Sequence, residues 1–169
     1  TQAMMAPTMI IMILEEPAFS NYNLSSFRTL FYGSSPMAAE WVQKSINQFA
    51  STGIQQGYGL TETSPILTTL DPDDHALAIS TGNLDILRSA GRPVIGVDLK
   101  ILNEQGQEQP TGEAGEVCVR GPNVTKGYLN RPDENKKSFK NGWFHTGDIG
   151  RIDDNGLMFL MDRKKDKAD

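Results

Sequence analysis

The sequence predicts an α/β fold in two parts, a portion of a layered α/β subdomain followed by a small antiparallel, β-barrel-like subdomain. Before about residue 90 the apolar pattern switches between helix and strand spacing, which is typical of layered α/β domains. Beyond about residue 91, short alternating runs lie between turns, which favours antiparallel strands. We expect the parts at residues 1–90 and 91–161, with the boundary near Ser89–Pro93, and a terminal segment at 162–169.

The first elements are marked by proline and glycine. Pro7 fits the first turn of a short helix, and Pro17 ends that helix. Thr29–Tyr32 is an apolar and aromatic run that predicts a buried strand closed by Gly33. Between them, Ser20–Ser26 is expected to form a polar loop.

A second helix and strand are expected after this strand. Ser35 is a suitable N-cap with Pro36 at the first helical position. Gly53 ends this helix, and Ile54–Gln56 forms the next strand. Residues at helical spacing predict one apolar face: Ala38, Val42, Ile46 and Phe49.

Alternation and turns predict the strands of the second part. Apolar residues alternate with polar ones through Val97–Ile101 and again through Gly115–Gly121. Asp154–Gly156 lies between two runs that contain apolar residues, and Asn-Gly at such a position is a strong hairpin signal. We therefore expect antiparallel pairing across this turn.

Composition excludes several classes of function. The formal net charge is −5, which argues against general nucleic-acid binding. The most apolar run, Met9–Leu14, is far too short to span a membrane, and no transmembrane segment is expected. Cys118 is the only cysteine, and with His75 and His145 it makes neither a disulfide framework nor zinc-ligand spacing. We expect a reducing, cytoplasmic location.

The stretch QGYGLTETSP indicates a nucleotide-binding loop. Gly57 and Gly59 let the backbone turn and approach a ligand closely. Tyr58 offers a ring face to a planar base, Thr61 a hydroxyl for phosphate, and Glu62 a hard oxygen ligand for Mg²⁺. The alternative is a glycine turn with a buried tyrosine and a surface glutamate.

The stretch GWFHTGDIG contains an aspartate between glycines. Asp148 is suited to accept both hydroxyls of a ribose, and its alternative is a turn aspartate bonded to its own backbone. We interpret His145 as a packed or solvent-edge histidine rather than a general base, because no carboxylate partner is evident nearby in the sequence.

Two further stretches have both a binding and a structural interpretation. Arg163 in DRKKDK would bind anionic or hydroxyl oxygens, or else belong to a solvated charge run. The YGSSPM turn would present main-chain N–H groups to a ligand, or else only cap a helix.

The four stretches in this order resemble the adenylate-forming superfamily and, within it, the acyl-CoA synthetases. GYGLTETSP resembles the family's adenine and magnesium motif, GWFHTGDIG its ribose motif, DRKKD its hinge motif, and YGSSPM the loop over the adenine. GEVCVRGPNVTKGYLNRP resembles the family's conserved barrel segment. The resemblance covers nearly the whole chain.

The resemblance implies a two-step reaction. A carboxylic acid, expected to be a fatty acid, attacks the α-phosphate of ATP to give acyl-AMP, and the thiol of coenzyme A then displaces AMP. Thr61 would meet the phosphate, and Glu62 would hold Mg²⁺. Asp148 would bind the ribose, Arg163 the ribose or phosphate, and Lys165 would lie at the hinge. The remaining implied nucleotide contacts are Gly33, Ser34, Ser35, Gln56, Gly57, Tyr58 and Gly59.

The sequence also departs from the family pattern. It has no Ser/Thr/Gly-rich phosphate loop ending in lysine, and only four residues follow Lys165, where the family carries a further domain with a catalytic lysine. We therefore expect a fragment that is inactive alone and that self-associates through Met9–Leu14. The alternatives are an adenylation domain of a nonribosomal peptide synthetase, which Leu60 disfavours, a luciferase-like oxidation, and a non-catalytic adenylate-binding remnant.

Overall fold

The computed structural model describes residues 1–163, which fall into two compact units. The first unit comprises Thr1–Tyr58 and Thr69–Gly91. The second comprises Gly59–Thr68 and the chain from Arg92 onward. Among the described residues, no helix is long and apolar enough to cross a membrane.

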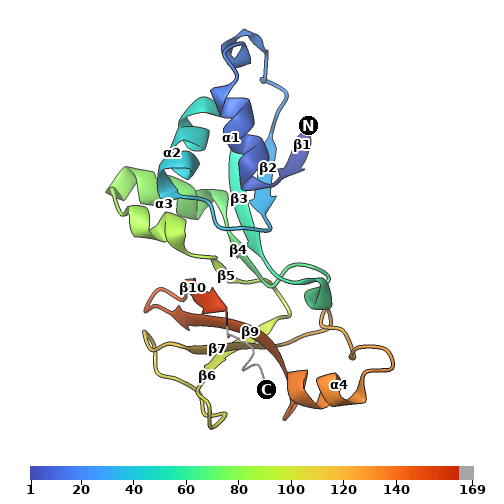
Figure 1. Cartoon of the computed structure of the whole chain (residues 1–169). Coiled ribbons are helices and arrows are strands. Elements are labelled where there is room, and N and C mark those ends of the chain that lie inside the picture. Colours follow the sequence, from blue (N-terminus) through green and yellow to red (C-terminus); the bar gives the residue numbers. More distant parts are fainter. Residues whose placement is uncertain (164–169) are drawn as a thin grey trace. The chain divides into compact units, whose positions relative to one another are not determined.

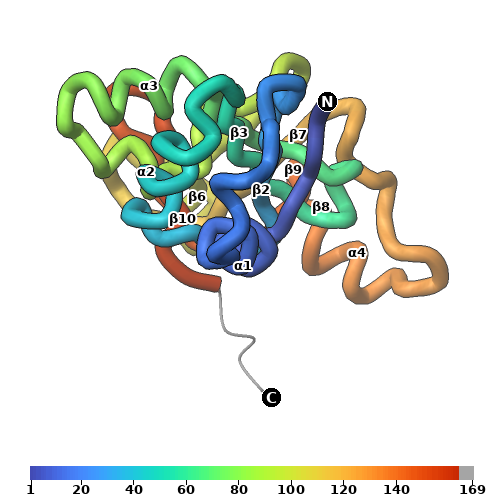
Figure 2. Tube along the Cα trace, turned by 90° about the horizontal axis from the view of Figure 1, so that it is seen from above, coloured from blue at the N-terminus to red at the C-terminus, as the bar shows by residue number. Residues whose placement is uncertain are grey.

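A parallel sheet forms the centre of the first unit. Its strands β1 (Gln2–Met5), β2 (Thr29–Gly33), β3 (Gly53–Tyr58) and β4 (Thr68–Leu70) follow one another in that order across the sheet. β2 pairs in parallel with β1 and with β3, and Figure 2 shows it between them. Parallel neighbours need crossover connections, which here contain helices. The predicted α/β class is therefore confirmed.

Three helices belong to this unit: α1 (Pro7–Glu15), α2 (Ala39–Gln48) and α3 (Pro72–Thr81) (Figure 1). Short 3₁₀ turns lie at Phe19–Asn21 and Leu84–Arg88. α1 begins at its proline as predicted. The core is apolar and includes a tyrosine whose hydroxyl is hydrogen-bonded. Its fully buried side chains include Ile10, Leu30, Tyr32, Val42, Leu70 and Leu87.

The predicted start of α2 is wrong. The helix begins at Ala39 rather than Pro36, and Ser35 caps no helix. Ser34 has a left-handed backbone with φ of 71°, and Ala38 is extended with ψ of 140°. This path buries the side chain of Met37 and leaves Ala38 exposed, so burial of the methionine takes precedence over the local proline signal.

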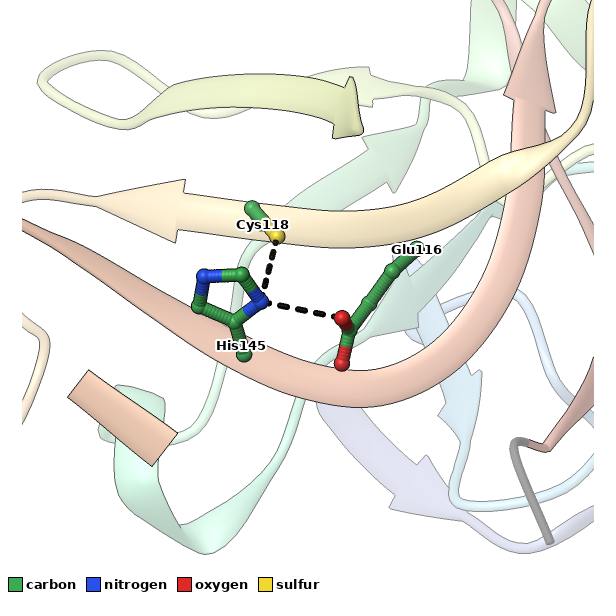
Figure 3. Close-up of side chains that lie close together, drawn as sticks. All are labelled: Glu116, Cys118 and His145. Atoms are coloured by element: carbon green, nitrogen blue, oxygen red, sulfur yellow. Dashed lines mark hydrogen bonds and ion pairs between the residues drawn. The ribbon is translucent and has the colours of Figure 1, made fainter. Parts of the chain in front are cut away.

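An antiparallel sheet forms the second unit. Its main strands are ordered β10-β9-β7-β6, and the short β8 also pairs with β9. Figure 3 shows β9 curving along its length, in keeping with the barrel-like expectation. The bounds of its strands are β6 (Asp98–Leu102), β7 (Gly115–Arg120), β8 (Phe139–Lys140), β9 (Trp143–Ile152) and β10 (Met158–Arg163). The two-residue β5 (Arg92–Pro93) instead ends the strand order of the first sheet, after β4.

The predicted hairpin at Asp154–Gly156 is confirmed. β9 and β10 pair antiparallel on either side of it, and Gly156 takes a left-handed φ of 74°. Helix α4 (Pro132–Ser138) and the 3₁₀ turn η2 (Thr61–Thr63) complete the second unit. The η2 turn holds two of the predicted site residues, Thr61 and Glu62.

Candidate functional site

The carboxyl ends of β2 and β3 bring two predicted nucleotide stretches together. Tyr32 pairs with Gln56 and Gly33 with Gly57, so the loop after β2 emerges beside the end of β3. A Cβ on Gly33 would lie 2.5 Å from the main-chain oxygen of Gly57, so only glycine allows the two strands this approach. Ser34, Ser35 and Tyr58 lie at the same edge, where open α/β sheets bind ligands.

A buried polar network lies under this edge, and sequence reasoning missed it. The Tyr32 hydroxyl donates to Gln56 Oε1 at 3.2 Å and lies 3.2 Å from His75 Nε2. His75 Nδ1 lies 2.8 Å from the carbonyl oxygen of Asp71, so Nδ1 carries the proton and Nε2 is an acceptor. The Tyr32 hydroxyl has one proton and therefore donates to either Gln56 or His75 at any one time.

Burial sets the protonation states of this network. It lowers the pKa of His75 below its ordinary value, although the Asp71 carbonyl and the carboxylates of Asp71 and Asp74 act in the opposite direction. Burial also raises the pKa of Tyr32 well above its ordinary value. Both groups are therefore neutral near pH 7, and the network fixes the side chain of Gln56 without placing charge at the strand ends.

The loop Gly59–Thr68, which contains the GLTETSP part of QGYGLTETSP, belongs to the second unit and is held by close contacts. A Cβ on Gly59 would lie only 1.7 Å from the main-chain oxygen of Pro65, so the turn requires glycine there. The buried Thr63 hydroxyl accepts from the Leu60 N–H at 2.9 Å, which closes η2. Thr61 is left exposed on that turn.

Glu62 is oriented by partners distant in sequence. Its Oε1 accepts from the Tyr128 hydroxyl at 2.8 Å, and its carbonyl accepts from the Thr125 N–H at 2.8 Å. Desolvation, followed by the hydrogen bond to Glu62, raises the pKa of Tyr128 to about 12, so this hydroxyl stays a donor at neutral pH. The Asn123 side-chain amide donates to the carbonyls of Thr63 and Ile66, and these two hydrogen bonds hold the main chain on either side of Pro65.

Asp148 and Arg163 are brought together by the β9–β10 hairpin. They are register partners, and Arg163 Nε lies 3.9 Å from Asp148 Oδ1. The Asp148 side chain is 15% exposed and that of Arg163 is 76% exposed. The Asp148 N–H donates to Thr146 Oγ1 at 3.1 Å, and the buried Thr146 hydroxyl donates to Val117. Lys165 lies outside the described residues.

The sequence shows no evident carboxylate partner near His145, but the fold supplies one from a distant position. The His145 Nδ1 lies 2.9 Å from Glu116 Oε2 and 3.3 Å from Cys118 Sγ (Figure 3). The partners lie 29 and 27 positions away in sequence, and the β7–β9 pairing joins them. The signal available in the sequence was the spacing of Glu116 and Cys118, which places both on one face of a strand.

Comparison with known proteins identifies the family. The sequence profile of the AMP-binding enzyme family matches residues 1–129. The chain is 36% identical over 166 residues to the medium/long-chain-fatty-acid–CoA ligase FadD8 of Mycobacterium tuberculosis, a match that covers 98% of this chain and 28% of the ligase. The chain belongs to the AMP-binding enzyme family, which is the adenylate-forming family that the motifs resemble.

Solved structures give the same assignment. The amide bond synthetase McbA of Marinactinospora thermotolerans is 32% identical with a TM-score of 0.89, over 98% of this chain and 32% of that one. The O-succinylbenzoate coenzyme A synthetase MenE of Bacillus subtilis, solved with ATP and a magnesium ion, is 34% identical with a TM-score of 0.82. This match covers 97% of this chain and 32% of MenE. The chain thus spans about a third of the length of these proteins.

Proposed function

We propose that this chain is part of an ATP-dependent, AMP-forming acid–CoA ligase. In the first step a carboxylate oxygen attacks the α-phosphorus of ATP, and pyrophosphate leaves to give acyl-AMP. In the second step the sulfur of coenzyme A attacks the acyl carbon, and AMP leaves with the bonding electrons. The observation that carries the proposal is the likeness, over 97% of the chain, to a coenzyme A synthetase solved with ATP and magnesium.

The proposed roles follow from the position and chemistry of each side chain. Tyr58 and the main chain of Gln56 and Gly57, with Gly33–Ser35 at the adjacent strand end, would contact the base. These residues supply a flat ring and unblocked backbone, and the neutral Tyr32–His75 network below them adds no charge that would repel the nucleotide.

The second unit would supply the polar contacts. Asp148 is a part-buried acceptor suited to ribose hydroxyls, and Arg163 beside it is an exposed donor suited to ribose or phosphate oxygens. Thr61 would donate to the phosphate. Glu62 fits a magnesium ion, because its carboxylate is half-buried and Tyr128 fixes its orientation. A bound magnesium ion would neutralise charge on the phosphates, and the side chains described here would orient the nucleotide.

The acyl acceptor defines a second candidate function. The likeness to McbA, the amide bond synthetase with the TM-score of 0.89, supports an amine as the nucleophile in place of the coenzyme A thiol. Both candidates share the acyl-AMP step and differ only in the nucleophile that attacks the acyl carbon. The identity of the acid is also a proposal. The likeness to FadD8 supports a fatty acid, whereas MenE is named for O-succinylbenzoate.

Two properties of the chain complete the proposal. We propose a cytoplasmic location, since a reducing compartment keeps a single buried cysteine such as Cys118 in its thiol form. We also propose that it self-associates weakly, because Met9 and Met12 in the predicted apolar segment are 51% and 71% exposed.

Calorimetric titration of the 169-residue chain with AMP tests the nucleotide site. We expect micromolar binding that weakens about tenfold or more in D148N, because the neutral amide replaces a charged acceptor of two ribose hydroxyls. D154N is the matched control, since Asp154 lies exposed in the turn of the same hairpin and should leave affinity unchanged. Absence of AMP binding, or equal affinities for D148N and D154N, would contradict the proposal.

Acyl-AMP mimics with a non-hydrolysable linkage distinguish the acids. A fatty-acyl mimic should bind more tightly than AMP itself, and more tightly than a mimic with an aromatic acyl group. The reverse order would reject the fatty acid while leaving the adenylate site intact.

A further inference from the structure

Three metal-ligating side chains, none of them assigned to the nucleotide, converge between β7 and β9. Cys118 and His145 are register partners on the two strands. Glu116 lies two positions before Cys118 on β7, and the register between the strands shifts at this point. The group thus combines a sulfur, a nitrogen and an oxygen donor, drawn as sticks in Figure 3.

The geometry does not suit a proton relay. In a Cys–His–acid catalytic arrangement the two ring nitrogens contact two different partners. Here both contacts end on one atom, because Nδ1 of His145 faces Cys118 Sγ at 3.3 Å and Glu116 Oε2 at 2.9 Å (Figure 3). Three potential metal-ligand atoms that lie close to one another are instead the arrangement that binding of a shared cation requires.

The distances fit a small tetrahedral ion. Zinc bonds of about 2.3 Å to sulfur and about 2.0–2.2 Å to nitrogen or oxygen place neighbouring ligand atoms roughly 3.3–3.6 Å apart. The ligand atoms of Glu116, Cys118 and His145 all lie within 4.8 Å of one another, and the sulfur–nitrogen distance is already 3.3 Å. Binding would require only small movements of the Glu116 carboxylate.

The cluster also has an entrance. Glu116 and His145 line a cavity of about 480 Å³ within the second unit, and their side chains are 15% and 14% exposed. Cys118 is fully buried behind them. A cation held by the three side chains would keep one position directed to the cavity, with room there for a water or another small ligand.

The charge balance favours a divalent cation. A Cys118 thiolate and the Glu116 carboxylate supply two negative charges, and His145 binds as the neutral imidazole. Two lysines, Lys100 and Lys140, line the same cavity. Lys100 is the register partner of Cys118, and its ammonium group is paired with Glu108. Repulsion from Lys100 is therefore largely compensated.

We propose that Glu116, Cys118 and His145 form a binding site for a divalent transition-metal ion of the zinc class, with a fourth position open to the cavity. A sulfur, nitrogen and oxygen set selects borderline-soft ions over magnesium. The site joins β7 to β9, the strand that also carries Asp148. The proposal is independent of the nucleotide function.

Cobalt(II) is the direct probe, because cobalt bonded to thiolate gives a near-ultraviolet charge-transfer band and Cys118 is the only cysteine. Titration of the 169-residue chain should produce this band, and zinc should abolish it by displacement. C118S should lose the band, and E116Q should bind cobalt more than about tenfold more weakly. E104Q is the matched control, since Glu104 lines the same cavity outside the cluster and should bind cobalt as the wild type does.

Protection of the thiol gives a second measurement that does not depend on C118S folding. Zinc should slow the reaction of Cys118 with a thiol reagent at least about tenfold in the wild type and E104Q, and little in E116Q. Far-ultraviolet circular dichroism checks that each variant is folded. A wild-type chain that gives no charge-transfer band, or an E116Q chain that binds cobalt and is protected by zinc as the wild type is, would overturn the proposal.

Discussion

Glu62 and Glu116 are both partly buried glutamates of the second unit, yet their neighbours differ in chemistry. Glu62 lies on a 3₁₀ turn, and its carboxylate accepts from the Tyr128 hydroxyl at 2.8 Å. Glu116 lies on β7, and its carboxylate lies 2.9 Å from the imidazole of His145, which also contacts Cys118. The first carboxylate accepts from an oxygen donor, whereas the second lies beside a nitrogen and a sulfur.

This difference indicates that the neighbouring groups, and not the carboxylate alone, determine which metal ion a glutamate binds. A carboxylate fixed by a hydroxyl donor presents a hard oxygen, which suits magnesium that keeps water and phosphate oxygens as its other ligands. A carboxylate beside imidazole and thiol suits a softer ion that replaces its waters with protein ligands. The two glutamates should therefore respond to different ions, and each can be changed without affecting the other.

The largest effect is expected for E62Q in ATP binding. In the wild type, magnesium should strengthen ATP binding, and E62Q should lower the affinity in magnesium by about tenfold or more, because the amide is a poor magnesium ligand. Calorimetry with and without magnesium measures this. E104Q removes another glutamate of the same unit and serves as the control. An E62Q chain that responds to magnesium as the wild type does would remove Glu62 from the proposed site.

A smaller effect is expected for Y128F. The substitution removes the hydroxyl that orients Glu62 but keeps the ring that packs edge-on against Phe139. Loss of one hydrogen bond to a charged group costs about 1.5–3 kcal/mol, and the part expressed in binding should lower magnesium–ATP affinity roughly fivefold. Y22F, at a tyrosine 66% exposed, is the control. Equal affinities for Y128F and Y22F would show that Glu62 needs no orienting donor.

A modest pH effect is expected in the first unit from His75. Its pKa is lowered by burial, so the unfolded chain binds a proton at a higher pH than the folded chain does. The contribution of neutral His75 to the free energy of unfolding is therefore fully present above the ordinary histidine pKa of 6.5. This contribution is lost as the pH drops below that value. Thermal unfolding of the wild type at about pH 7.5 and about pH 5.5 should show this fall, and H75Q should show less of it. A fall of the same size in H75Q would assign the effect to other groups.

The smallest effect concerns self-association. M12E places a charge on a methionine that is 71% exposed in α1, and it should lower the average mass seen by light scattering at high concentration. M161E, at a methionine 59% exposed on β10, is the control. A wild-type chain that stays monomeric at every concentration would contradict self-association altogether.

Much of the fold could be predicted because its signals are local. The hairpin follows from Asn155-Gly156 between alternating runs, and the first helix from Pro7. The start of α2 could not be predicted, because burial of Met37 outweighs the Ser35-Pro36 signal. Strands β1 and β4 also gave no usable signal, since each is short and becomes a strand only by pairing within the sheet.

The candidate site divides in the same way. Glu62, Asp148 and the glycines could be proposed from the sequence, because each motif is continuous. Tyr128, which orients Glu62 from 66 positions away, and Glu116, which meets His145 from 29 positions away, were missed as partners. Such pairs depend on strand register and loop packing, which one sequence without relatives does not reveal.

One crossed titration tests the distinction between the two glutamates most directly. The wild type, E62Q and E116Q are each titrated with magnesium–ATP by calorimetry and with cobalt(II) by absorbance. E62Q should lose magnesium–ATP affinity and keep the thiolate-to-cobalt band, whereas E116Q should keep magnesium–ATP affinity and bind cobalt more than about tenfold more weakly. A variant that weakens both ligands, or two variants that weaken neither, would contradict the account.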